Sequence, residues 1–465
     1  MIFPNHKVIL FPLETYVREI DFRLALAFNI LRPGRQIILG NHTDIYHLTM
    51  QLKNAVYVGK CLHNVSPTRP RECYDHAKKS HTKIIYLHEE GGVFENDIEH
   101  IKAGLFRRLQ PDWLSAEDYF CAWGEVQSQI YKDSSPTFKN NIYITGHPRF
   151  DLCSDKFKPL YQEEICELKN KFGPFLLINT NFSRFTRIGG NGCYFGPPWT
   201  PKNDEIKIKQ AADYLGYDAN QFSGFIKLIA AIEKRFPDLN IVIRPHPSED
   251  TRYFSDVFAH FKKVHIAREG NLISWLRACQ TLIHSGCTTG IEGCLCGTKV
   301  IAYDFQKDSP FLKNLPNLAG RQANNEEEVL NFLADDSWKG GIESLSANSN
   351  KQLTSFFTNF QNNHDSFATL SEIVDLCLQD SIETTVCKPI GNHIWKGRSQ
   401  AIKNCLRSIL PNSLHFKSNQ NLHAKQKFPG FNINKINYKT NILSQIYGKE
   451  IRVKKINNML ISLSI

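Results

Sequence analysis

Short apolar segments alternate with helical patterns along most of the chain, and this alternation limits the fold more than any other feature. Buried-strand patterns occur at residues 8–11, 36–39, 55–58, 83–87, 119–122 and 141–145, with helical patterns at 20–30, 42–52 and 96–109. A second series has strand patterns at 175–179, 240–243, 264–266, 281–284 and 300–303, with helical patterns at 223–235, 271–279 and 291–296. Such alternation predicts parallel sheets joined by crossover helices. We therefore expect an α/β protein with two Rossmann-like halves.

The length of 465 residues allows two domains and an appendage. A charged, helix-prone stretch separates the two series. We predict an N-terminal Rossmann-like domain at 1–152, a linker at 153–171, a C-terminal Rossmann-like domain with closing helices at 172–389, and a basic tail at 390–465. Such sheets bind ligands at the carboxyl ends of their strands. Two halves that face each other predict a binding cleft between them.

The positive charge is concentrated in the tail. From Lys388 onward there are 14 Lys and Arg against one acid, Glu450, which leaves 42 bases and 45 acids in the rest of the chain. Two interpretations of the tail stay open: a solvated, disordered extension, or a segment attracted to an anionic membrane surface. No nucleic acid is expected, because the tail lacks a recognisable binding motif. Without a signal segment or a membrane-length apolar run, we expect a cytoplasmic protein, with a peripheral position on the inner face of the membrane as the alternative.

Neither a metal nor a cofactor is expected. The 13 cysteines are odd in number and form no C-x-x-C pair. Asp335 and Asp336 lack the strand context of a metal-binding pair. The chain also lacks a phosphate loop and a convincing G-x-G-x-x-G fingerprint, which argues against a kinase or a dehydrogenase.

The most informative segment is residues 282–293, which read L-I-H-S-G-C-T-T-G-I-E-G. A buried strand ends, small and hydroxyl residues turn, and a helix begins near Thr289. Helix N-termini favour phosphate, hydroxyl side chains add donors, and glycine allows close approach of the backbone. The sequence therefore predicts a nucleotide site made by Ser285, Gly286, Thr288 and Thr289, with Glu292 accepting hydrogen bonds from ribose. Simple helix capping is the alternative.

Two other strand ends carry reactive side chains. Arg244-Pro-His-Pro places a histidine, held by two prolines, beside an arginine, which suits binding of phosphate or protonation of a leaving group. Glu89 and Glu90 follow another strand, and a carboxylate there could take the proton from an attacking hydroxyl. Neighbouring strand residues point to opposite sides, so one of the two glutamates should face the substrate. Weaker signals, interpreted as residues that line the cleft, are Gly146, His147, Asn179 and Asn181.

In this order, the motifs resemble those of the bacterial surface carbohydrate biosynthesis proteins. The motifs are Leu13-Glu14, Glu89-Glu-Gly91, Trp123-Gly124, Gly146-His-Pro-Arg-Phe-Asp151, Asn179-Thr-Asn-Phe182, Arg244-Pro-His-Pro-Ser-Glu249 and His284-Ser-Gly-Cys-Thr-Thr289, within residues 7–330. That family is similar to GT-B enzymes that use CMP-activated acidic sugars, the bacterial sialyltransferases and Kdo transferases. The resemblance implies a base at Glu89, a phosphate contact at His246-Pro247, and hydroxyls on the same phosphate from Thr288 and Thr289 or Ser285.

The predicted function is transfer of a sugar from a nucleotide-activated donor, with a CMP-nonulosonate or CMP-Kdo-like donor favoured, to a surface polysaccharide or a lipid-linked acceptor. Three alternatives stay open. They are an isomerase of the UDP-sugar 2-epimerase type, a CDP-polyol phosphotransferase, and a non-catalytic scaffold that binds a nucleotide sugar.

Overall fold

The computed structural model describes residues 6–63, 71–94, 97–135, 138–196, 204–379, 382–386 and 427–465. The chain divides into two compact units. Unit 1 comprises residues 1–91, 105–152 and 356–465, and unit 2 comprises residues 92–104 and 153–355. Each unit has its own largely parallel sheet with crossover helices, which confirms the prediction of an α/β protein with two Rossmann-like halves.

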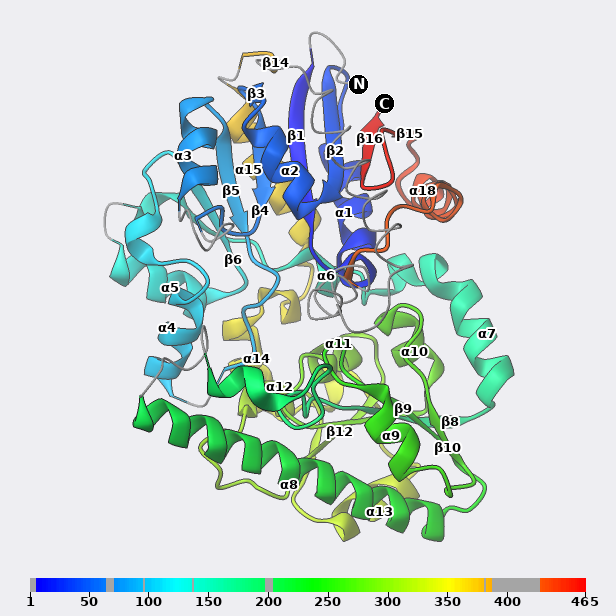
Figure 1. Cartoon of the computed structure of the whole chain (residues 1–465). Helices are drawn as coiled ribbons and strands as arrows, with labels where there is room; N and C mark the ends of the chain where they lie inside the picture. Colours follow the sequence, from blue (N-terminus) through cyan, green and yellow to red (C-terminus); the bar gives the residue numbers. More distant parts are fainter. Residues whose placement is uncertain are drawn as a thin grey trace, which may run out of the picture. The chain divides into compact units, whose positions relative to one another are not determined.

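The sheet of unit 1 has the strand order β15-β16-β2-β1-β4-β5-β6-β7 (Figure 1). Neighbours from β2 to β7 are parallel, whereas β16 runs antiparallel to β2 and to β15. Since β2 lies on one side of β1 and β4 on the other, the strand order reverses between β1 and β4. The parallel strands are β1 (Lys7–Leu13), β2 (Arg35–Asn41), β4 (Val56–Gly59), β5 (Lys83–Leu87), β6 (Tyr119–Ala122) and β7 (Ile142–Ile144).

Three helices in or bordering unit 1 overlap the helical patterns predicted at 20–30, 42–52 and 96–109, whereas those at 72–79, 125–134 and 148–151 were not predicted. The helices of unit 1 are α1 (Tyr16–Ile30), α2 (His42–Thr49), α3 (Glu72–Lys79), α5 (Glu125–Ser134), α6 (Pro148–Asp151) and α15 (Ser366–Gln379), while α4 (Ile98–Phe106) spans the division between the units. Helix α1 packs against α15 and is buried along most of its length. Its buried residues include the charged Glu19, Asp21 and Arg23. Buried charged groups need partners, so these three residues are expected to form ion pairs or hydrogen bonds with neighbouring elements. A short pair, β3 (Leu52–Lys53) and β14 (Thr385–Val386), completes the unit.

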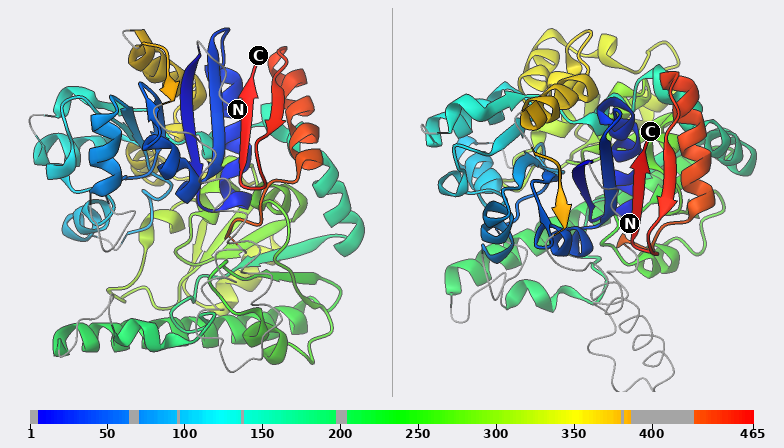
Figure 2. Two further views of the ribbon diagram at one scale, coloured as in Figure 1. Left: turned by 45° about the horizontal axis from the view of Figure 1, so that its top comes forward. Right: turned by 90° about the horizontal axis from the view of Figure 1, so that it is seen from above.

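Residues 427–465 fold as part of unit 1 (Figure 2). Helix α18 (Ile433–Tyr447) lies beside α1, where Tyr447 stacks on Phe28 with ring centroids 5.4 Å apart. The hairpin of β15 (Arg452–Lys455) and β16 (Leu460–Ser464) covers the open edge of β2, and every residue of β16 is buried. Of the two interpretations left open for the tail, a disordered extension does not hold for 427–465, because its apolar residues bury against the sheet. Residues 390–426 of the predicted tail lie outside the described residues, and its membrane association stays a prediction.

The sheet of unit 2 is wholly parallel, with the order β10-β9-β8-β11-β12-β13. Its strands are β8 (Phe175–Asn179), β9 (Asn240–Arg244), β10 (Val264–Ile266), β11 (Thr281–His284), β12 (Lys299–Tyr303) and β13 (Arg321–Ala323). Its helices are α7 (Gln162–Phe172), α8 (Glu205–Arg235), α9 (Thr251–Val257), α10 (Leu272–Ala278), α11 (Thr289–Leu295), α12 (Asn314–Asn317), α13 (Glu326–Ala334) and α14 (Ala347–Phe356). The strand order reverses between β8 and β11.

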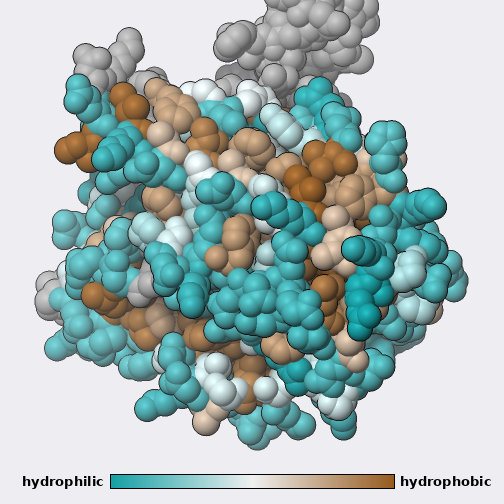
Figure 3. Space-filling view, turned by 90° about the horizontal axis from the view of Figure 1, so that it is seen from below, coloured by the Kyte–Doolittle hydropathy of each residue, from teal (hydrophilic) through white to brown (hydrophobic). Residues whose placement is uncertain are grey.

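The domain boundaries differ from the predicted ones in several places, and residues 92–104, predicted within the first domain, belong to unit 2. The predicted linker at 153–171 is mostly helix, and α7 belongs to unit 2, where the Glu164 carboxylate accepts a hydrogen bond from Ser274 Oγ at 2.6 Å. The closing helices predicted for the second domain are divided, because the chain returns to unit 1 at residue 356 and α15 packs on α1 and α6. In the described part of the chain, no helix has the length and apolar character to cross a membrane. Hydrophilic residues dominate the surface seen in Figure 3, and hydrophobic ones form separate patches.

Candidate functional site

In unit 2, the strand order reverses between two strands that each end in a buried polar side chain. Ligands of parallel α/β sheets bind beyond the carboxyl ends of the strands, where the order reverses. Strand β8 ends at Asn179, and the neighbouring β11 ends at His284. Of the two predicted segments of highest interest, 244–249 begins at the last residue of β9, and 285–292 directly follows β11. The fold therefore gathers these segments at the carboxyl edge of one sheet.

Asn179 and His284 have unsatisfied polar atoms. Both side-chain atoms of the Asn179 amide and both ring nitrogens of His284 are buried without a hydrogen-bond partner among the described residues. Burial lowers the pKa of His284 to about 3, so the ring is neutral at pH 7. A buried polar group without a partner carries a free-energy cost, and a ligand that supplies the missing bonds would remove it. His284 was assigned no role from the sequence, since a strand-end histidine is not by itself a signal.

His246 is held with a defined tautomer. Its Nδ1 accepts the backbone N–H of Ser248 at 3.2 Å and lies 2.6 Å from Ser248 Oγ. A nitrogen that accepts an N–H carries no proton, so in the neutral ring the proton is on Nε2. His246 therefore has Nε2–H as its donor. The neighbouring Pro247 is exposed in the turn.

Glu249 fixes the loop that carries His246. Its buried carboxylate accepts hydrogen bonds from the backbone N–H of His246 at 2.6 Å and of Phe182 at 2.7 Å, and from the hydroxyls of Thr180 and Thr186. One side chain thus joins the turn after β9 to the loop after β8. Burial raises the pKa of Glu249. Asn181, predicted to line the cleft, lies partly exposed in the same loop after β8.

The hydroxyl turn between β11 and α11 contains a glycine in the left-handed region. Gly286 has φ +55°, a conformation that favours glycine, and its N–H donates to Asn317 Oδ1 at 2.8 Å. This N–H is therefore engaged within the protein. Ser285 and Thr288 are partly exposed, whereas Thr289 is buried. Phosphate binding by these residues stays a prediction.

Arg244 ends β9 close to Glu292 of α11. Burial lowers the pKa of Arg244 to about 10, an effect that the charge of Glu292 opposes. Arg244 Nη2 donates to the carbonyl of Gly270 at 3.2 Å. Arg244 and Glu292, both predicted to bind the nucleotide, are therefore close enough for their charges to interact. The guanidinium of Arg244 stays charged at pH 7.

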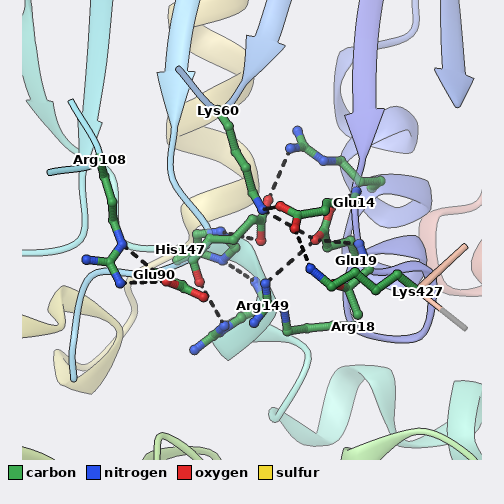
Figure 4. A network of polar contacts seen from close by, with 12 residues as sticks. Glu14, Arg18, Glu19, Lys60, Glu90, Arg108, His147, Arg149 and Lys427 are labelled. Atoms are coloured by element: carbon green, nitrogen blue, oxygen red, sulfur yellow. Dashed lines mark hydrogen bonds and ion pairs between the residues drawn. The ribbon is translucent and has the colours of Figure 1, made fainter. Parts of the chain in front are cut away.

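In unit 1, the strand order reverses where Glu14 and Lys60 meet. Lys60 follows β4, Glu14 follows β1, and Lys60 Nζ forms an ion pair with Glu14 Oε2. Figure 4 shows the network that continues from this pair. Lys427 Nζ reaches the other oxygen of Glu14 at 2.7 Å, while Lys60 and Arg18 lie 4.0 Å and 3.7 Å from Glu19 Oε1. Three cations and two carboxylates therefore alternate at the carboxyl edge of this sheet.

Glu89 lies inside the protein, which argues against its predicted role as the base. Its side chain is fully buried, with Oε1 3.2 Å from Arg23 Nη2 and Oε2 3.3 Å from His147 Nε2. Burial alone would raise the pKa of Glu89, but His147, Arg23 and Lys60 hold it below its usual range. The sequence could not reveal this, because Arg23 is on α1 and appears as an ordinary helical arginine.

Glu90 is the exposed member of the pair. Its side chain is 55% exposed, and Arg108 Nη2 lies 2.5 Å from its Oε2. Burial of part of the group raises the pKa of Glu90, yet Arg108 and Arg18 outweigh this and lower the pKa to about 2. The prediction that the two glutamates point to opposite sides matches this geometry.

The predicted residues Gly146 and His147 have mainly structural contacts. His147 Nδ1 accepts the N–H of Arg149 at 3.2 Å, so Nε2 carries the proton that faces Glu89. Burial lowers the pKa of His147 to about 4. Gly146 has φ +65°, and a Cβ there would lie 2.7 Å from Asn359 Oδ1. Within the described residues no group of His, Cys, Asp or Glu is arranged to hold a metal ion.

The sequence matches no family model and no curated protein. Several solved structures are similar to it at low identity. The UDP-GlcNAc 2-epimerase of Methanocaldococcus jannaschii, in complex with UDP-GlcNAc and UDP, has a TM-score of 0.46 and 12% identity over 80% of this chain and 99% of its own. The wall teichoic acid polymerase TagF has a TM-score of 0.43 and 11% identity, covering 82% and 89%. The UDP-GlcNAc 2-epimerase of Neisseria meningitidis, bound to UDP-GlcNAc, has a TM-score of 0.43 and 10% identity, covering 80% and 99%. These likenesses are distant, and the architecture described above rests on the strand order of the chain itself.

Proposed function

We propose that this protein is a metal-independent glycosyltransferase that moves a sugar from a nucleotide-activated donor, of the CMP-nonulosonate or CMP-Kdo kind, to a surface polysaccharide or glycolipid acceptor. The observation that carries the proposal is the carboxyl edge of unit 2. There Arg244 and His246 accompany two buried polar side chains, Asn179 and His284, for which the described residues supply no hydrogen-bond partner where the strand order reverses. This combination suits a nucleotide with an anionic phosphate and many hydrogen-bonding groups.

The chemistry of the donor half follows from these side chains. When the bond between the anomeric carbon and the phosphate oxygen breaks, CMP leaves with the electron pair and gains negative charge. The Nε2–H of His246 donates to that phosphate, and the guanidinium of Arg244 offsets the charge. Ser285, Thr288 and Thr289 are the further hydroxyl donors of this proposal. Asn179 and His284 would hydrogen-bond the nucleotide, and Glu292 its ribose.

The acceptor half is assigned to the carboxyl edge of unit 1, with Glu90 as the base. Its carboxylate is exposed, whereas that of Glu89 is buried in an ion pair. Sugar transfer passes through an oxocarbenium-like transition state. The proton of the attacking hydroxyl becomes strongly acidic only as its oxygen bonds to the anomeric carbon. The exposed carboxylate of Glu90 is ionised at pH 7 and accepts that proton as the new bond forms.

The first test is a thermal-shift panel with CMP, CDP, UDP, GDP and ADP, comparing the wild type with His246→Ala. The exposed His260→Ala serves as the matched control in the same unit. A nucleotide at a hundredfold its Kd adds about 2.7 kcal/mol of stability. Stabilisation by CMP that is lost in His246→Ala and kept in His260→Ala supports the proposal. Preference for UDP would replace it with a UDP-sugar transferase or epimerase, preference for CDP with a polyol phosphotransferase, and no response with a scaffold.

The second test is acceptor dependence. Transfer consumes donor only when an acceptor hydroxyl is present, whereas an epimerase acts on the nucleotide sugar alone. Release of CMP that rises with added acceptor, with the sugar recovered on that acceptor, distinguishes the two. We place this reaction in the cytoplasm, at the inner face of the membrane, where exposed cations of β15 meet anionic lipid.

A further inference from the structure

Glu14 lies between two ammonium groups at the point in unit 1 where the strand order reverses. Lys60 Nζ pairs with its Oε2 and Lys427 Nζ with its Oε1, at 2.7 Å for the latter. Figure 4 shows that both lysines, which come from different parts of the chain, point toward this carboxylate. Lys60 follows β4, and Lys427 precedes α18 in the C-terminal segment.

The charges around Glu14 are unbalanced. Arg18 is linked to the same group through Glu19, so Arg18, Lys60 and Lys427 contact two carboxylates, Glu14 and Glu19. The charges of Glu89 and Glu90 also act on Arg18, but each of these glutamates has an arginine partner of its own, Arg23 and Arg108. Arg23 is excluded from this count because it pairs with Glu89. The cluster therefore keeps a positive charge while Glu14 is ionised.

The cluster is also accessible to solutes. The side chains of Lys60, Lys427, Glu14 and Arg18 are 26%, 36%, 32% and 35% exposed. Glu19, in contrast, is buried and accepts the backbone N–H groups of Glu14 and Thr15, which holds it in place. Glu14 is therefore the carboxylate that can move, and Glu19 is the fixed one.

We propose that Lys60, Lys427 and Arg18 form a binding site for an oxyanion, a phosphate or a carboxylate carried by the acceptor, and that Glu14 occupies the position of this oxyanion when no acceptor is bound. The identity of the oxyanion as part of an acceptor rests on the proposed transferase function. The binding site itself does not, since it lies wholly within unit 1. An incoming oxyanion replaces the Glu14 carboxylate between the two lysines. The C-terminal segment contributes one of the two.

The experiment is a calorimetric titration of the full chain with inorganic phosphate, and separately with glucuronate, at low ionic strength. Charge neutralisation at exposed ion pairs changes affinity by about fivefold. Glu14→Gln removes the competing charge and should tighten oxyanion binding by about that factor, whereas Lys427→Met and Lys60→Met should weaken it. Lys435→Met, on the exposed face of α18, is the matched control and should match the wild type. Tighter binding of phosphate would indicate that the acceptor carries a phosphate, and tighter binding of glucuronate that it carries a carboxylate.

Unchanged affinity in both Glu14→Gln and Lys427→Met would overturn the inference. Lys427 is exposed enough that its replacement should leave the fold intact, so the test holds even if Lys60→Met is unstable. All variants leave unit 2 unchanged, so phosphate bound there cancels in the comparison. CMP binding measured on the same proteins reports on the proposed function separately. If the wild type does not bind CMP, but oxyanion affinity still changes in Glu14→Gln and Lys427→Met, the transferase proposal fails and the oxyanion site stands.

Discussion

Glu89 and Glu90 are neighbours in the chain, yet Glu89 is enclosed by Arg23 and His147 while Glu90 is exposed beside Arg108. The two carboxylates should therefore respond differently to the same substitution. Glu90→Gln should lower the rate of transfer by about a hundredfold or more, because a general base is lost. Glu89→Gln should instead destabilise the protein by about 3 kcal/mol, since the buried guanidinium of Arg23 loses its charge partner.

Urea unfolding of both variants, together with single-turnover transfer, checks this. A stable Glu89→Gln protein with no activity, beside an active Glu90→Gln protein, would return the base to Glu89.

The tautomer of His246 predicts which replacement keeps activity. Because Nε2 carries the donor hydrogen, His246→Gln places an amide N–H near the same position, whereas His246→Asn reaches only as far as Nδ1. We expect His246→Gln to retain more transfer than His246→Asn, with His246→Ala the lowest. Equal rates for the two amides would show that the donor at Nε2 is not used.

His284 and Gly290 are packed in direct contact. A Cβ at Gly290 would lie 2.2 Å from His284 Nε2. Gly290→Ala should therefore destabilise unit 2 by about 1–3 kcal/mol through overpacking. In the His284→Ala background the same change should cost much less, because the ring is gone. A double-mutant cycle by chemical denaturation measures this coupling, and additive costs would contradict the contact.

The same histidine predicts a pH dependence. The pKa of His284 is lowered to about 3 in the folded protein, while an unfolded histidine titrates near its ordinary value of about 6.5. The unfolded state then binds more protons between these values, so stability is lost as pH falls below about 6.5. His284→Leu should reduce the number of protons taken up on unfolding between pH 7 and pH 5 by close to one, and so flatten the dependence of the unfolding free energy on pH. Unfolding free energies measured at pH 7 and pH 5 give the slope, and identical slopes would show that His284 takes up a proton while folded.

Membrane association can be tested without disturbing unit 1. Removal of residues 427–465 would strip β16 from β2 and expose buried Leu460, Ile461 and Leu463, so a truncated chain would report on folding instead. Neutralising Arg452, Lys454 and Lys455, which are exposed on β15, avoids this problem. The triple glutamine variant should bind anionic vesicles more weakly at low salt. Unchanged binding would remove β15 from the membrane proposal.

The alternation of strands and helices was enough to predict both sheets, and β5, β6, β8, β10 and β11 have the predicted bounds. Of these strands, β5, β6, β8 and β11 are buried along most or all of their length, so their apolar runs are unambiguous, whereas β10 is a partly exposed strand at the sheet edge. The hairpin β15–β16 was missed because the basic sequence of β15 does not resemble a buried strand, and the apolar run of β16 is short. The ion-pair network was missed for a different reason. Glu14, Lys60 and Lys427 are far apart in the chain, and only the meeting of β1, β4 and the C-terminal segment makes them neighbours.

The return of the chain to unit 1 at residue 356 has a consequence for the order of synthesis. Most of unit 2 is one continuous segment, complete once residue 355 has left the ribosome. Unit 1 must wait for α15 and for β16, so the edge of β2 stays uncovered while unit 2 is being made. Nascent chains are most prone to association at such uncovered edges. The protein should therefore depend on chaperones during synthesis of its first unit, and slow translation beyond residue 356 should lower its soluble yield.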